Sequence, residues 1–161
     1  MEWIVRCGAR QPILKNTDTG EQGMNITALQ ARTIIDAAEK KARELGLNIV
    51  IAIVDEGTHL KAFHRMDGAV LASNDIAIRK ARTAALFQAE SDAVWEYCKP
   101  GAPAPCLELS NGGLAPFGGG IPLKAQGGAV IGALGVSGGA VSQDVEVAKA
   151  AHAAYEKAIS H

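Results

Sequence analysis

The fold is decided by the stretch NIVIAIVDEGTHLKAFHR, residues 48–65. Its first part, Asn48 to Val54, is an almost unbroken apolar run rich in branched side chains, which indicates a strand buried on both faces. Asp55-Glu56-Gly57-Thr58 then predicts a turn, because Gly57 can adopt a positive φ. The chain returns from His59 to Arg65 with side chains that alternate between two faces. The stretch therefore predicts an antiparallel hairpin.

Helices are predicted on both sides of this hairpin. Thr27 and Gln30 have the spacing of a capping box, and the helix that they begin should end at Gly46. A second helix is expected over about residues 71–88, and a shorter helical piece over 92–97. Ser142 is expected to cap a final helix, in which the apolar spacing predicts a buried stripe made of Val145, Ala148, His152, Tyr155 and Ile159.

Two more strands are predicted in the C-terminal half, at Ile121 to Lys124 and at Ala129 to Val136. The second run shows no polar alternation, so Val130 should be as deeply buried as Ile51 in the first strand. Residues 1–23 show no clear period, and we interpret them as an N-terminal extension, loosely held or paired with a partner, before a domain at 24–161. The element order predicts an α/β (α+β) domain with helices packed on an antiparallel sheet.

Composition excludes several classes of function. A length of 161 residues suggests one domain, and a net charge of −1 with only 3 Phe, 2 Trp and 2 Tyr argues against a nucleic-acid partner. No apolar run reaches the ~20 residues that span a membrane, so no membrane partner is expected. The 3 cysteines show no pairing pattern, which argues against a disulfide framework and favours a cytoplasmic location.

The end of the predicted hairpin carries the first candidate binding groups. Arg65 offers a planar donor fork for a carboxylate or propionate, and Asp67 could orient that fork or simply occupy a turn. His59, at the start of the same strand, is a further candidate. Because His59 and His64 alternate on opposite faces, and because no spacing assembles a zinc or iron ligand set, no metal site is predicted.

Lys80 and a glycine loop are the second set of candidates. Lys80 lies on the apolar face of its predicted helix, where a lysine either pairs with a carboxylate or serves a ligand. Gly118, Gly119 and Gly120 would let backbone approach a ligand, or would only make a tight loop. Convergence of these groups with Arg65 predicts a site for an anion. The alternative is an Arg65–Asp67–Lys80 ion-pair network that fixes the chain reversal.

At these same residues the chain resembles a known family, that of GlcG and haem-binding protein S, which is also called the haem-degrading domain family. It is related to the C-terminal domain of PduO-type proteins. The matching segments run in the family's order over about residues 25–160, and they are VDEGTHL at 54–60, RMDGA at 65–69, KARTA at 80–84, GGIP at 119–122 and IGALGVSGG at 131–139.

This resemblance implies a profilin-like fold, with a five-stranded antiparallel sheet and helices packed on it. It also implies self-association into dimers or larger rings such as octamers, and haem as a cofactor. The family's best-known member ligates haem through a histidine just before the first helix. Residues 1–26 contain no histidine here, so that ligand does not carry over, and His59, His64 or His152 would have to replace it.

Three hypotheses about function follow. The first is an oligomeric protein that binds a small molecule, haem or another tetrapyrrole, at Arg65, Asp67, Lys80 and the glycine loop. The second is an enzyme acting on a small hydroxy acid or related carboxylate, with Arg65 as anion clamp and Lys80 or His59 as acid or base. The third is an accessory or oligomerisation module without a ligand.

Overall fold

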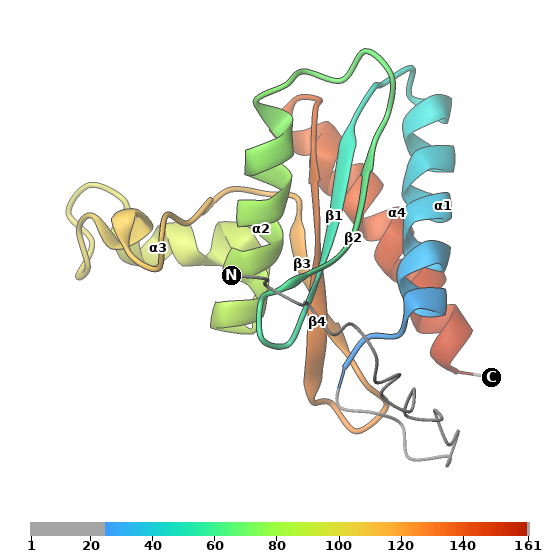
Figure 1. Cartoon of the computed structure of the whole chain (residues 1–161). Coiled ribbons are helices and arrows are strands. Elements are labelled where there is room, and N and C mark those ends of the chain that lie inside the picture. The colour runs from blue at the N-terminus through green and yellow to red at the C-terminus, as the bar shows by residue number, and fades with distance from the viewer. Residues whose placement is uncertain (1–24, 161) are drawn as a thin grey trace, which may run out of the picture.

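A four-stranded antiparallel sheet runs through residues 25–160, the part of the chain that the computed structural model describes (Figure 1). The strands are β1 (Val50–Asp55), β2 (Leu60–Arg65), β3 (Gly120–Lys124) and β4 (Val130–Ser137), in the order β2-β1-β4-β3. The expectation of a fifth strand is wrong for these residues. Between the second helix and β3, Pro100, Pro103 and Pro105 interrupt the chain and prevent regular pairing there.

Helices cover both faces of the sheet and make the fold α+β. Helices α1 (Ala28–Glu44) and α4 (Val141–Ile159) pack against each other on one face, and α2 (Ser73–Phe87) covers the other (Figure 1). The 3-10 turn η1 (Ser91–Val94), the short helix α3 (Trp95–Cys98) and the 3-10 turn η2 (Leu107–Leu109) form an arm that projects beyond the sheet. The predicted sharing of one face by the two terminal helices is confirmed.

The central strand β1 explains why the opening sequence stretch is apolar throughout. Its even and odd positions are both buried, because Ile51 and Ile53 face the core under α1 and α4 whereas Ala52 faces α2. The predicted hairpin is present, but the positive φ of its turn belongs to Thr58 (φ 66°) and not to Gly57. A Cβ at Gly57 would lie 2.9 Å from the ring of His59, an exposed side chain that can move aside.

The first predicted helix is confirmed in detail. The Thr27 side chain accepts a hydrogen bond from the Gln30 backbone N–H, and the Gln30 side chain accepts one from the Thr27 backbone N–H. Gly46 follows the end of α1 with a φ of 67°, the left-handed conformation that suits a helix C-terminus. Local signals are sufficient here because both ends of the helix satisfy their own backbone groups.

Helix α4 differs from its predicted phase. It begins at Val141, and Gln143, not Ser142, provides the side chain that accepts from the Ala140 backbone N–H (2.9 Å). Its buried residues are Asp144, Val147, Ala148, Ala151 and Tyr155. The predicted stripe members Val145, His152 and Ile159 are partly exposed instead, as is Val130 in β4.

Gly135 in β4 lets α2 lie close to the sheet. A Cβ at Gly135 would lie 2.1 Å from the Ala77 carbonyl oxygen and 2.6 Å from the Ala81 backbone nitrogen. The facing side of α2 is correspondingly small, with Ala77 and Ala81 fully buried. Close backbone approach on this face therefore depends on glycine.

Candidate functional site

The residues predicted as a single site lie in three places. His59 sits in the hairpin turn, where its side chain is 84% exposed and its Nδ1 lies 3.3 Å from Asp55 Oδ1. Arg65 is the last residue of β2, Asp67 follows two residues later, and both are exposed. Lys80 lies on α2. Within residues 25–160 no ion pair joins Lys80 to Arg65 or Asp67, so the proposed three-residue network is not present there.

Lys80 forms a buried ion pair with a residue that sequence reasoning did not connect to it. Its Nζ donates to Asp144 Oδ2 (2.7 Å) and to the Val136 carbonyl oxygen (2.9 Å), and lies 4.8 Å from the centre of the Phe117 ring. The side chains of Lys80 and Asp144 are 0% and 3% exposed. Burial lowers the pKa of Lys80, while the hydrogen bond and charge of Asp144 oppose that shift.

The glycine loop makes room for this lysine. A Cβ at Gly119 would lie 3.0 Å from Lys80 Nζ, and one at Gly120 would lie 2.4 Å from the Lys80 carbonyl oxygen. A Cβ at Gly118 would instead meet Val145 at 2.4 Å. The loop and Lys80 are therefore brought together as predicted, and the contacts that require glycine are contacts with the protein itself.

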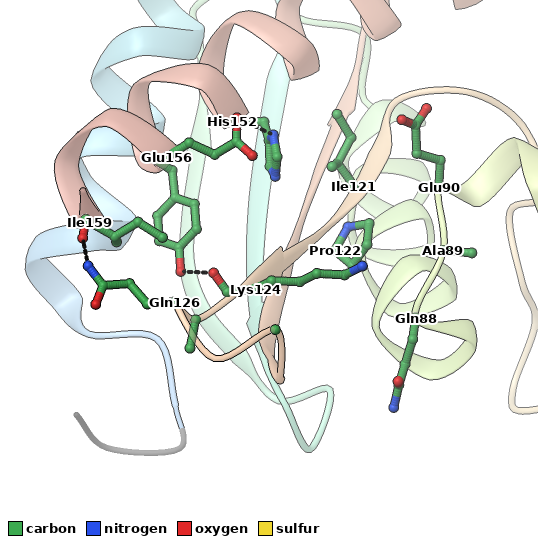
Figure 2. Close-up of a pocket in the computed structure, with 13 residues that line it drawn as sticks. Gln88, Ala89, Glu90, Ile121, Pro122, Lys124, Gln126, His152, Glu156 and Ile159 are labelled. Carbon is green, nitrogen blue, oxygen red and sulfur yellow. Dashed lines mark hydrogen bonds and ion pairs between the residues drawn. The ribbon is translucent and has the colours of Figure 1, made fainter. Parts of the chain in front are cut away.

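A cavity of about 490 Å³ lies between β3, α4 and the end of α2 (Figure 2). We call it the β3–α4 cavity. The side chains labelled in Figure 2 come from β3 and the loop after it, from α4, and from the residues that follow α2. His152 and Glu156 on α4 lie opposite Glu90, which follows α2. Its residues are Gln88, Ala89, Glu90, Ile121, Pro122, Lys124, Ala125, Gln126, Gly128, His152, Tyr155, Glu156 and Ile159.

His152 is the group in this cavity that can coordinate a metal centre. Its side chain is 24% exposed, and Nδ1 lies 3.7 Å from Glu156 Oε2, so neither ring nitrogen forms a hydrogen bond with residues 25–160. A carboxylate beside one imidazole nitrogen favours the tautomer that leaves the other nitrogen available as a ligand. The cavity therefore contains an imidazole that forms no hydrogen bond within residues 25–160 and has a carboxylate nearby.

Tyr155 closes the base of the same cavity. Its hydroxyl donates to the Lys124 carbonyl oxygen (2.9 Å), and burial raises its pKa, so it stays neutral. Gln126 donates to the Ile159 carbonyl oxygen and ties the β3–β4 loop to the end of α4. These two bonds hold the edge strand and the helix together below the cavity.

The start of α1 adjoins this cavity. A smaller hollow of about 70 Å³ is lined by Asn25, Thr27 and Gln30, and it shares four lining residues with the β3–α4 cavity, namely Ala125, Gln126, Tyr155 and Ile159. The segment just before the first helix and the face of α4 that carries Tyr155 therefore belong to one neighbourhood.

Known proteins are similar to this chain in sequence and in fold. Residues 26–153 match a family described as haem degrading protein HbpS-like. An uncharacterised 15.0 kDa protein from the dhaT-dhaS intergenic region of Citrobacter freundii is 38% identical over 132 residues, which is 81% of this chain and 92% of that protein. The chain belongs to the HbpS-like family.

Solved structures of HbpS-like relatives agree with this fold. The Klebsiella pneumoniae protein ORFY superposes with a TM-score of 0.78 at 36% identity, over 81% of this chain and 90% of that one. A PduOC:heme complex superposes with a TM-score of 0.77 at 34% identity, over 81% of this chain and 94% of that one. The family resemblance found in the sequence is confirmed.

Two findings limit the sites that this HbpS-like chain can offer. Its described residues contain no cluster of three or more His, Cys, Asp or Glu side chains that could hold a metal ion by themselves. In the same part of the chain, no helix has the length and apolar character needed to cross a membrane.

Sequence reasoning did not find the β3–α4 cavity. His152 and Tyr155 were recognised as neighbours on one helix face, but that face was interpreted as core. One available signal was Pro122, because a proline within a strand indicates a sheet edge, and an edge beside a helix can leave a cavity. The partners from the end of α2 lie more than 30 residues away in sequence and gave no signal.

Proposed function

We propose that this protein binds haem or a related tetrapyrrole in the β3–α4 cavity, where the His152 imidazole would ligate the metal. The observation that carries the proposal is an imidazole without hydrogen bonds to residues 25–160, at the wall of a cavity of about 490 Å³. Cavities of roughly 300–1,000 Å³ are typical of small-molecule sites.

The cavity's residues fit such a ligand. Ile121, Pro122 and Ile159 supply apolar surface for the macrocycle. Lys124 supplies a cation for a propionate, and Glu156 beside His152 Nδ1 would hold the imidazole in orientation. When bound, the haem iron would supply redox and ligand-binding chemistry, while the protein would fix its orientation and limit its contact with water.

The family relationship supports the same location. One structural relative is a haem complex. The resemblance places the family's haem-ligating histidine just before the first helix, and in this chain the start of α1 adjoins the cavity through shared residues. His152 thus offers an imidazole in the neighbourhood where the N-terminal ligand is missing.

Titration with haemin tests the proposal. We expect a sharp shift of the Soret band that saturates at one equivalent per chain, and we expect His152→Ala to abolish it while keeping its cooperative melt. His59→Ala and His64→Ala are matched controls, because these histidines lie on β2 and its turn, and both variants should titrate like the wild type. Absence of a Soret shift, or an unchanged shift in His152→Ala, would reject the proposal.

A further inference from the structure

A third hollow, of about 350 Å³, lies at the opposite end of β2 from its turn. It is formed by α1, by Asn48 just before β1, and by the segment from His64 to Asp67. We call it the β2-end pocket. It shares no lining residue with the β3–α4 cavity.

Hydrogen-bond donors in this pocket are not used by the protein. The guanidinium of Arg65 and the side-chain amide of Asn48 make no hydrogen bond within residues 25–160. The Nε2 atom of His64 is buried and also has no hydrogen-bond partner there. The free groups that a ligand could reach from solution are therefore those of Arg65 and Asn48, which are exposed.

Hydrogen-bond acceptors line the same pocket as these donors. Asp67 is exposed and forms no ion pair in the described residues. Glu39 uses Oε1 to accept from Arg43 (2.5 Å), whereas its Oε2 lies 3.6 Å from His64 Nε2. The hydrogen bond from Arg43 lowers the pKa of Glu39, which keeps this carboxylate charged.

The backbone holds the pocket's groups in place. Met66 is buried, and its N–H donates to the Ile49 carbonyl oxygen (3.0 Å), which fixes the chain between Arg65 and Asp67. A Cβ at Gly68 would lie 3.0 Å from Asn48 Nδ2, and its φ of 81° suits glycine alone. The RMDG segment is thus a fixed turn that presents a guanidinium and a carboxylate on either side of a buried anchor.

We propose that the β2-end pocket binds a small carboxylate that carries a hydroxyl or ammonium group on the adjacent carbon. The Arg65 fork would take the carboxylate by paired N–H bonds. Asp67 would accept from the adjacent donor. This inference is independent of the haem proposal, because the two sites share no residue.

Three molecules that differ at one position test this specificity. Propionate, lactate and alanine have the same carbon skeleton and carry hydrogen, hydroxyl and ammonium on the carbon next to the carboxylate. We expect calorimetric titration of the full chain to show lactate or alanine binding at least about fivefold more tightly than propionate. Inorganic phosphate, titrated in parallel, should bind no better than propionate, since it lacks that arrangement.

Substitutions of arginine test whether the carboxylate binds at Arg65. Arg65→Ala should lower the affinity for the tighter of the two ligands about tenfold or more, the scale of a lost charge-assisted bidentate contact. Arg65→Lys should recover only part of that affinity. Arg32→Ala, an exposed arginine on α1, is the control and should bind normally. Arg65→Ala should keep the haemin titration of the wild type, which separates the two proposals.

Two results would overturn this inference. One is that propionate, lactate and alanine bind with equal affinity, that phosphate binds as tightly as they do, or that none of them binds up to millimolar concentration. The other is Arg65→Ala binding as the wild type does.

Discussion

At the scale of single residues, the Lys80–Asp144 pair is the feature with the clearest energetic consequence. The pair joins α2 to the first turn of α4, across 64 positions of sequence, and it is almost fully buried. Removing one member of a buried pair leaves an uncompensated charge, whereas replacing both can be neutral. The pair therefore fixes which face of α4 turns inward.

Asp144→Asn should destabilise the protein by about 3–5 kcal/mol at pH 7, the usual cost of breaking a buried pair. The Gly139 N–H donates to Asp144 Oδ1 (2.9 Å), and asparagine keeps an oxygen for it. The variant therefore removes the charge and the acceptor oxygen that face Lys80 Nζ. Urea unfolding measures the change, and Asp36→Asn on the exposed side of α1 is the control. A loss below about 1 kcal/mol would mean that the charge on Asp144 contributes little.

The same variant has a pH dependence of known sign. Loss of the Asp144 charge removes the effects that raise the pKa of Lys80, so its folded-state pKa falls further below the unfolded value of about 10.4. Between those two values the unfolded chain binds a proton that the folded chain does not, and stability rises with pH. The stability deficit of Asp144→Asn against the wild type should therefore shrink from pH 7 to pH 10.

At the scale of elements, close packing of α2 on β4 depends on glycine. Gly135→Ala should cost about 1–3 kcal/mol or more, the range for overpacking, because the added methyl group would meet the backbone of Ala77 and not a movable side chain. Gly127→Ala is the matched control, since no atom lies within 4 Å of its Cβ position and its φ is not positive. Equal melting temperatures for the two variants would contradict this account.

Elements with local signals were predictable, and those fixed by distant partners were not. The hairpin of β1 and β2 and the capped start of α1 follow from adjacent residues, and both are confirmed. The predicted phase of α4 was wrong because Asp144 turns inward to contact Lys80, and the periodicity of α4 alone does not indicate that partner. The β3–α4 cavity was missed for the same reason, because it forms only when three distant segments pack.

At the scale of the whole molecule, residues 25–160 enclose a continuous core under α1 and α4. Residues 1–23, the predicted extension, lie outside the described residues. A chain that begins at Met24 should still unfold cooperatively in a thermal melt, because residues from Ile26 to Tyr155 already form a hydrophobic core cluster. Loss of the cooperative transition would place the boundary of the domain elsewhere.

Self-association is expected from the exposed apolar side chains of the projecting arm. Trp95, Tyr97 and Leu109 are 45%, 54% and 74% exposed there. Such clusters are typical of contact surfaces, so we expect light scattering to give the mass of a dimer or larger assembly. Leu109→Ser should reduce that mass, whereas Leu29→Ser, at an equally exposed leucine on α1, should not. A monomer mass for the wild type would remove the expectation.

The strand order has a practical consequence for concentrated solutions. A sheet that does not close on itself has two borders at which foreign strands can add and start fibrils. Here one border strand contains Pro122, which has no N–H to donate, and the other presents the exposed cations Lys61 and Arg65. Both features oppose edge-to-edge polymerisation, so the protein should resist amyloid-type fibrillation even where its helical arm brings copies together.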